Sequence, residues 1–182
     1  MHYRPVNSCI LFVPTLDGCQ LLTVEHLKAA DGRLHPAQQA MVDQHGSQCG
    51  FCTPGFVMSL FALYVTESRP TRARVNDVLS GNLCRCTGYR PIIDAAQAMY
   101  DYAWDEPTRA HAAQTAKRLA ELRSNPEPLE LEHNGRRYFA PTSAAQLDAL
   151  ITAHPKATLL AGGTDVGHQA PHAQEMRAPL AR

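Results

Sequence analysis

Residues 48–59 read QCGFCTPGFVMS, and this stretch decides the fold because a C-x2-C motif runs directly into an apolar helix. Pro54 suits the first turn of a helix, where its missing N–H costs little. We expect Thr53 to be the N-cap of that helix. The residues from Pro54 to Ser68 are apolar on almost every face, which predicts a helix buried on most sides.

A second cysteine pair, Cys84 and Cys86, lies in LSGNLCRCTGYRPI at residues 79–92. One helical hairpin separates the two pairs, so four thiolates can converge. A 2Fe-2S cluster suits this arrangement, with the C-x2-C sulfurs on one iron and the C-x-C sulfurs on the other. Gly50 would let backbone N–H donors approach the cluster, and Arg85 adds positive charge. A four-cysteine zinc site is the main alternative.

The region from Thr23 to Trp104 has a helical pattern around these loops. Four helices are expected, beginning near Pro36, Pro54, Thr71 and Pro91, with the last continuing through Trp104. Gly81 is expected to take the left-handed conformation that ends the third helix. The residues predicted to face inward on the last two helices are Val75, Val78, Leu79, Ile92, Ala95, Ala96 and Met99.

The composition excludes several classes of protein. Of 182 residues, 17 are Lys or Arg and 17 are Asp or Glu, and no basic block is present, so we expect no nucleic-acid partner. No apolar run is long enough to span a bilayer, so we expect no membrane association and a cytoplasmic location. In that reducing compartment, six cysteines indicate metal or redox chemistry rather than disulfides.

Together, QCGFCTPGFVMS and LSGNLCRCTGYRPI resemble the second iron-sulfur domain of the molybdenum hydroxylases, the family of xanthine dehydrogenase and aldehyde oxidase. The resemblance disfavours zinc. It implies a four-helix bundle with one 2Fe-2S cluster bound by Cys49, Cys52, Cys84 and Cys86. It also implies that Gln48 and the backbone at Cys86 face the molybdopterin of a partner subunit.

The resemblance extends toward the N-terminus. Residues 6–18, VNSCILFVPTLDG, are similar to the last strand of the plant-type ferredoxin domain, in which Cys9 would be the fourth ligand of a second 2Fe-2S cluster. Its three partner ligands are not in this sequence, so we expect Cys9 to be an orphan ligand that lies as a core cysteine in a strand. Cys19 matches no ligand position and is expected to be an ordinary thiol.

The resemblance also extends toward the C-terminus. Residues 159–167, LLAGGTDVG, are similar to the glycine-rich turn that holds the flavin pyrophosphate in the FAD domain of this family. The turn follows a predicted strand at RRYFA, a capped helix and a short buried strand. Consecutive glycines can expose N–H groups to phosphate. The implied FAD contacts are Ala161, Gly162, Gly163, Thr164 and Asp165.

We therefore predict a mainly α chain. Its segments are 1–20, a remnant ferredoxin-like strand; 21–105, the helical 2Fe-2S domain; 106–134, a surface helix and linker; 135–167, the truncated start of an α/β FAD-binding domain; and 168–182, an irregular tail. FAD and a second 2Fe-2S cluster are expected only in a full-length subunit.

The resemblance implies an oxidoreductase function in a hetero-oligomer with a molybdenum-cofactor-binding large subunit, like xanthine dehydrogenase. The chain would relay electrons from molybdopterin toward FAD and NAD during oxidation of hypoxanthine or xanthine, and it is expected to be inactive when isolated. A zinc-stabilised interaction domain and a non-functional truncated subunit are the alternatives.

Overall fold

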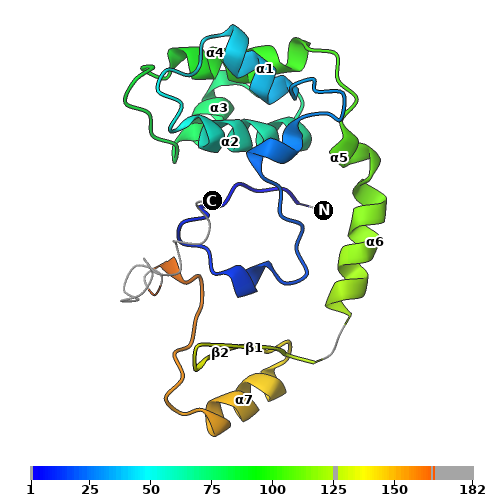
Figure 1. Ribbon diagram of the computed structural model, residues 1–182, viewed down its shortest axis with the longest axis vertical. Coiled ribbons are helices and arrows are strands. Elements are labelled where there is room, and N and C mark those ends of the chain that lie inside the picture. Colours follow the sequence, from blue (N-terminus) through cyan, green and yellow to red (C-terminus); the bar gives the residue numbers. More distant parts are fainter. Residues whose placement is uncertain (1, 125–126, 165, 167–182) are drawn as a thin grey trace. The chain divides into compact units, whose positions relative to one another are not determined.

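The computed structural model describes residues 2–124, 127–164 and 166 (Figure 1). The chain divides into two compact units. The helical unit comprises residues 21–114 and those before Val6, and the second unit comprises residues 6–20 and those from Thr115 onward. No helix in the described part of the chain is long and apolar enough to cross a membrane.

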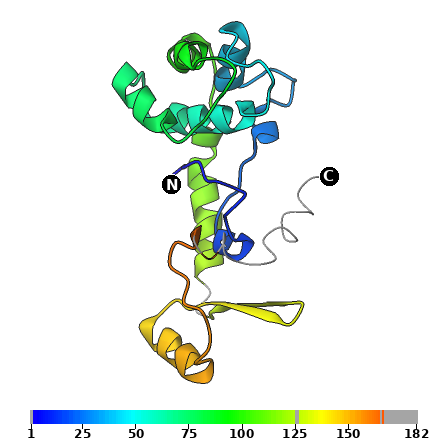
Figure 2. The ribbon, with the colours of Figure 1, turned by 90° about the vertical axis from the view of Figure 1, so that its left-hand side faces the viewer.

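The helical unit is built around the stretch that follows the first cysteine motif. Its main helices are α1 (Pro36–Asp43), α2 (Thr53–Thr66), α3 (Arg72–Leu79) and α4 (Arg90–Ala98), all visible in Figures 1 and 2. Helices α1 and α3 each pack against both α2 and α4. The 3-10 turns η2 (Val24–Leu27) and η3 (Met99–Asp101) flank them. The prediction of a mainly helical chain is confirmed.

The core of this unit forms where these helices meet. Phe56 and Leu60 of α2, Val75 of α3 and Ile92 of α4 are each at most 1% exposed. The other residues predicted to face inward are also buried, except Val78, which is partly buried. The cysteine loops are therefore anchored on both sides by helices with well-packed inner faces.

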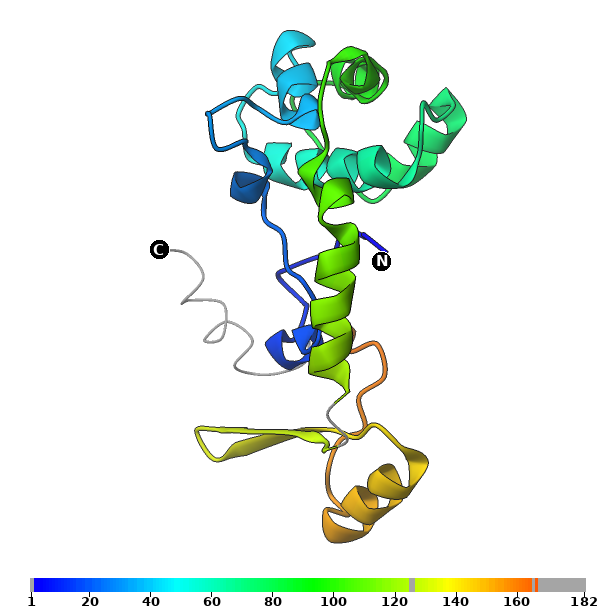
Figure 3. The same cartoon turned by 90° about the vertical axis from the view of Figure 1, so that its right-hand side faces the viewer.

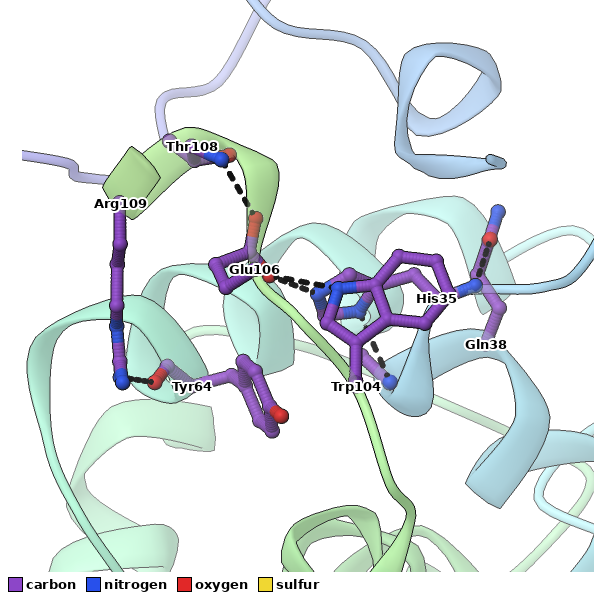
Figure 4. Close-up of polar contacts among 8 residues, drawn as sticks. His35, Gln38, Tyr64, Trp104, Glu106, Thr108 and Arg109 are labelled. Atoms are coloured by element: carbon purple, nitrogen blue, oxygen red, sulfur yellow. Dashed lines mark hydrogen bonds and ion pairs between the residues drawn. The ribbon is translucent and has the colours of Figure 1, made fainter. Parts of the chain in front are cut away.

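A buried polar cluster joins the start of α1 to the residues after α4 (Figure 4). His35 Nδ1 accepts the N–H of Ala37 at 3.1 Å, so the ring hydrogen lies on Nε2, which donates to Glu106 at 2.8 Å. Trp104 Nε1 and the Thr108 N–H also donate to the Glu106 carboxylate, at 3.2 and 3.0 Å. The side chains of His35 and Glu106 are only 1% and 5% exposed. Both oxygens of this buried carboxylate thus have donors.

These contacts fix α5 (Pro107–Ala110) on the helical unit. Burial disfavours ionisation of Glu106, but the hydrogen bonds from His35 and Thr108 outweigh that effect and lower its pKa to about 2. Arg109 donates to the main-chain oxygen of Tyr64 at 2.6 Å, and its guanidinium lies over the Tyr64 ring. Helix α6 (Ala112–Arg123) follows α5, which agrees with the surface helix predicted in this region.

The second unit contains a hairpin and a helix (Figure 3). Strands β1 (Leu129–His133) and β2 (Arg136–Ala140) pair antiparallel around Asn134 and Gly135, whose φ values are 51° and 71°. Ser143 caps α7 (Ala144–Ala153), so β2 and this capped helix agree with the sequence prediction. Strand β1 was missed because its residues were assigned to the linker, although Asn-Gly between two strands is a strong hairpin signal.

The predicted ferredoxin-like strand at residues 6–18 is wrong. The main-chain oxygen of Asn7 accepts the N–H groups of Ile10 and Leu11, both at 3.2 Å, and η1 (Val13–Leu16) follows. The described residues contain no neighbouring strand to satisfy an extended backbone here. Cys9 therefore lies exposed in a turn, and the prediction of a core cysteine in a strand is also wrong.

The predicted buried strand before the glycine turn is also wrong. The backbone at Leu159 and Leu160 is irregular, and Leu159 is 68% exposed. The sheet in the described residues is the β1–β2 hairpin alone, which gives this segment no strand to pair with. Asp165 and the predicted tail at 168–182 lie outside the described residues.

Three helix ends differ from their predicted positions. The N-cap of α2 is Cys52 rather than Thr53, which lies within the first helical turn. Ser80 rather than Gly81 ends α3, and Gly81 has no positive φ. Helix α4 ends at Ala98, where a 3-10 turn replaces the predicted continuation. The first cysteine motif still lies between α1 and α2, and the second between α3 and α4.

Candidate metal centre

The four cysteines of the two motifs come together in pairs. The sulfurs of Cys49 and Cys86 lie 3.5 Å apart, and Cys52 and Cys84 are close enough that each shifts the pKa of the other's thiol. These contacts join one cysteine of each motif, whereas the sequence interpretation paired the two sulfurs within each motif. Among the described residues, no three His, Cys, Asp or Glu side chains surround a single metal position.

The pairing across the motifs follows from the different depths of the cysteines. Cys84 is 8% exposed and belongs to the core of the helical unit, whereas Cys86 is exposed. The chain turns between them, so the two side chains of C-x-C do not share one side as they would in an extended loop. Cys52 is half-buried and Cys49 is exposed. The site therefore has an inner side and a solvent-facing side.

The sulfur of Cys84 has the most complete surroundings. It is 3.2 Å from the Thr87 hydroxyl, 3.5 Å from the Thr87 nitrogen and 3.4 Å from the Cys86 nitrogen. Hydrogen bonds from the Thr87 hydroxyl, the Thr87 N–H and the Cys86 N–H lower the pKa of the Cys84 thiol to about 7. Donors directed at a sulfur favour its anionic form, which is the form that binds metal.

The other sulfurs have simpler surroundings. A hydrogen bond from the Phe51 N–H, followed by one from Cys86, lowers the pKa of Cys49, while burial raises the pKa of Cys52. Cys52 also lies at the N-terminus of α2, the positive end of the helix dipole. The lowered pKa values of Cys49 and Cys84 and the helix N-terminus at Cys52 suit an anionic iron-sulfur cluster, whereas burial of Cys52 opposes its ionisation.

Gly50 lies in the turn of the C-x2-C loop, between the two cysteines of the first motif. Its φ is 81°, a value that residues with a side chain rarely adopt. A Cβ built on Gly50 would meet no atom within 4 Å. The turn of the C-x2-C loop, rather than crowding within the chain, therefore accounts for glycine at this position.

The surface around the loops includes other predicted residues. Gln48 and Arg85, each next to a cysteine of the site, are both exposed. Phe51 and Leu83 are 95% and 77% exposed, although both are large and apolar. The solvent-facing side of the four-cysteine site is thus flanked by one exposed apolar residue from each loop.

Thr87 and Tyr89 were missed at the sequence level. Thr87 donates to the Cys84 sulfur, and the Tyr89 hydroxyl accepts the Cys84 N–H at 3.0 Å. The available signal was their position in CTGYRP, directly after the second motif. Spacing cannot show that the chain turns back here, so it could not assign these contacts.

The remaining predicted site residues belong to the second unit. Cys9 and Cys19 are exposed, and Arg123 Nη2 lies 3.7 Å from the Cys19 sulfur. Gly162 and Gly163 have φ values of 82° and 87°. A Cβ on Gly163 would lie 3.2 Å from the ring of Phe12. Ala161 and Thr164 are exposed beside these glycines.

The family of 2Fe-2S binding domains matches residues 23–97, which include all four cysteines of the site. This segment is a 2Fe-2S binding domain, and such a domain binds one 2Fe-2S cluster.

The chain is homologous to two groups of oxidoreductases. Aldehyde oxidase 1 of Bos taurus is 50% identical over 96 residues, which are 53% of this chain and 7% of that protein. Xanthine dehydrogenase of Drosophila pseudoobscura pseudoobscura is 32% identical over an aligned stretch of 203 residues. The alignment covers 92% of this chain and 15% of that protein. The chain thus spans a small part of the length of these relatives.

A solved structure with local similarity is quinoline 2-oxidoreductase from Pseudomonas putida 86. It is 38% identical, and the match covers 53% of this chain and 60% of that chain with a TM-score of 0.49.

Proposed function

We propose that this chain carries an electron-transfer centre of a molybdenum hydroxylase of the xanthine dehydrogenase type. The cluster ligands are Cys49, Cys52, Cys84 and Cys86. Electrons pass from the molybdopterin of a partner subunit, which oxidises a purine such as hypoxanthine or xanthine, through this chain toward FAD and NAD.

The observation that carries this proposal is that the four cysteines lie at different depths, from the helical core to the surface. Cys84 is 8% exposed within the helical core, while Cys49 and Cys86 reach solvent. A redox group held there is anchored by the fold and still lies next to the surface, where electrons can pass between proteins. A centre that only stabilised the fold would gain nothing from an exposed side.

The chain's own residues provide ligands, donors and a docking surface. A bound 2Fe-2S cluster accepts and releases one electron at a time. Thr87 and the N–H groups near Cys84 stabilise the negative charge on the ligand sulfur. Gln48 and the backbone at Cys86 face the molybdopterin, and Phe51 and Leu83 anchor the partner.

The segments on either side of the helical domain contribute to binding of FAD and of a second cluster. The helical domain at 21–105 is followed by a linker at 106–134 and by the start of an FAD domain at 135–167. Ala161, Gly162, Gly163, Thr164 and Asp165 contact the pyrophosphate of the flavin, and Cys9 is a ligand of a second 2Fe-2S cluster. The free thiols suit a cytoplasmic location.

The docking proposal predicts that the chain co-elutes with a molybdenum-cofactor subunit of the xanthine dehydrogenase type. Phe51→Ser should weaken this association about tenfold or more, because loss of a buried aromatic anchor costs over about 1.4 kcal/mol. Affinity can be measured by titration of the purified chains, followed by cluster reduction on addition of xanthine.

Leu21→Ser is the matched control, since Leu21 is 58% exposed in the same unit but lies outside both cysteine loops. Equal affinities for the wild type and Phe51→Ser would contradict the proposed docking surface.

A further inference from the structure

Tyr89 combines an unusual backbone conformation with a direct contact to a cluster ligand. Its φ of 70° is in the left-handed region, although it is a bulky residue and the N-cap of α4. For such a residue this conformation is costly and persists only where surrounding contacts enforce it. The contacts of Tyr89 therefore need a structural or functional reason.

The side chain of Tyr89 reaches back over the C-x-C loop. Its hydroxyl accepts the Cys84 N–H at 3.0 Å, and its ring makes an edge contact with Phe56, which is 1% exposed in α2. The Tyr89 N–H in turn donates to the Thr87 hydroxyl at 3.3 Å, and that hydroxyl contacts the Cys84 sulfur. Tyr89 thus contacts both the main chain of the ligand and the group that donates to the ligand's sulfur.

We infer that Tyr89 is a positioning residue that holds the Cys84 loop in the conformation that directs donors at the ligand sulfur. With the Cys84 N–H bound to Tyr89, the loop turns so that the N–H groups of Cys86 and Thr87 lie 3.4 and 3.5 Å from that sulfur. Hydrogen bonds to ligand sulfurs help to set the reduction potential of an iron-sulfur cluster. Because such bonds stabilise the more negative reduced state, Tyr89 keeps the potential high. This role requires that the chain carry the cluster proposed above.

Tyr89→Phe tests the hydroxyl alone, because phenylalanine keeps the ring that packs on Phe56. The expected result is a cluster at wild-type iron content with a more negative midpoint potential and a changed EPR spectrum. Tyr100→Phe is the matched control: its hydroxyl is buried and has no hydrogen-bond partner among the described residues. That variant should leave the potential and the EPR spectrum unchanged.

A second readout does not depend on the cluster. In the protein from which iron has been removed, the Cys84 amide of Tyr89→Phe should exchange its hydrogen about tenfold faster or more, because it has lost its hydrogen-bond acceptor. The comparison is with the wild type and with Tyr100→Phe. Loss of iron from Tyr89→Phe with faster Cys84 exchange and unchanged helix content would also support a positioning role.

If the wild type carries a 2Fe-2S cluster, and Tyr89→Phe has the same potential, EPR spectrum and Cys84 amide exchange as the wild type, the role of Tyr89 is wrong and the proposed function still stands. A wild type that takes up no 2Fe-2S cluster would overturn both this inference and the proposed function.

Discussion

Cys84→Ser is expected to reduce the iron content of the purified chain by at least about tenfold, since loss of even an outer-shell contact commonly lowers metal affinity by that factor. Cys84 is the most buried of the four cysteines, and three donors surround its sulfur. A serine hydroxyl would present a shorter, harder oxygen ligand in its place. Cys52→Ala should have the same effect, because it removes a ligand at the start of α2.

Both substitutions should also lower the free energy of unfolding, because cluster binding and folding of the surrounding loops are coupled. Iron assay, visible absorption and urea unfolding measure the two effects. Cys19→Ala is the control, since Cys19 is exposed in the second unit and should affect neither quantity. Iron loss in Cys19→Ala, with normal iron in Cys84→Ser, would show that the ligand assignment is wrong.

His35→Ala should lower the free energy of unfolding by about 3 kcal/mol or more, because removing one partner of a buried charged contact leaves the other uncompensated. The change takes away the Nε2 donor of Glu106 and the Nδ1 acceptor that caps α1. It also removes edge contacts with Phe61, Tyr64 and Trp104. Urea unfolding at pH 7 measures the loss.

Arg69→Ala is a suitable comparison, because Arg69 pairs with Asp101 at the surface, where both side chains are more than 60% exposed. Loss of such a pair should cost about 1 kcal/mol or less. Similar losses for His35→Ala and Arg69→Ala would contradict the role assigned to the buried cluster.

The same cluster should make stability depend on pH. The pKa of Glu106 falls on folding from 4.5 to about 2, so its ionised form contributes about 3 kcal/mol above pH 4.5. That contribution is lost as the pH falls toward 2. Glu106→Gln should show a smaller loss of unfolding free energy between pH 5 and pH 2 than the wild type, and identical slopes would contradict the assignment.

The helices and the cysteine loops could be predicted from sequence because their signals are local. Pro36 located the start of α1, a long apolar run located α2, and apolar periodicity located α3 and α4, while the two cysteine motifs located loops between these helices. The helix caps were less predictable, since Thr53 and Gly81 are both favourable capping residues but Cys52 and Ser80 take those positions. A difference of one residue depends on contacts that the local pattern does not contain.

Contacts between distant residues were the least predictable part. The strands expected at residues 6–18 and before Gly162 require pairing partners, and the described residues contain none for them. The pairing of Cys49 with Cys86 depends on how the two loops turn, and so does the contact of Tyr89 with Cys84. Residue types and spacing identified the four thiols, whereas their depths and neighbours required the fold.

The most direct test of the central claim is anaerobic reconstitution of the full chain with iron and sulfide, followed by metal analysis and EPR of the reduced protein. We expect a coloured protein with two irons per chain, an EPR signal from one unpaired electron per cluster, and loss of both in Cys84→Ser. A colourless, EPR-silent protein that binds zinc in place of iron would contradict it.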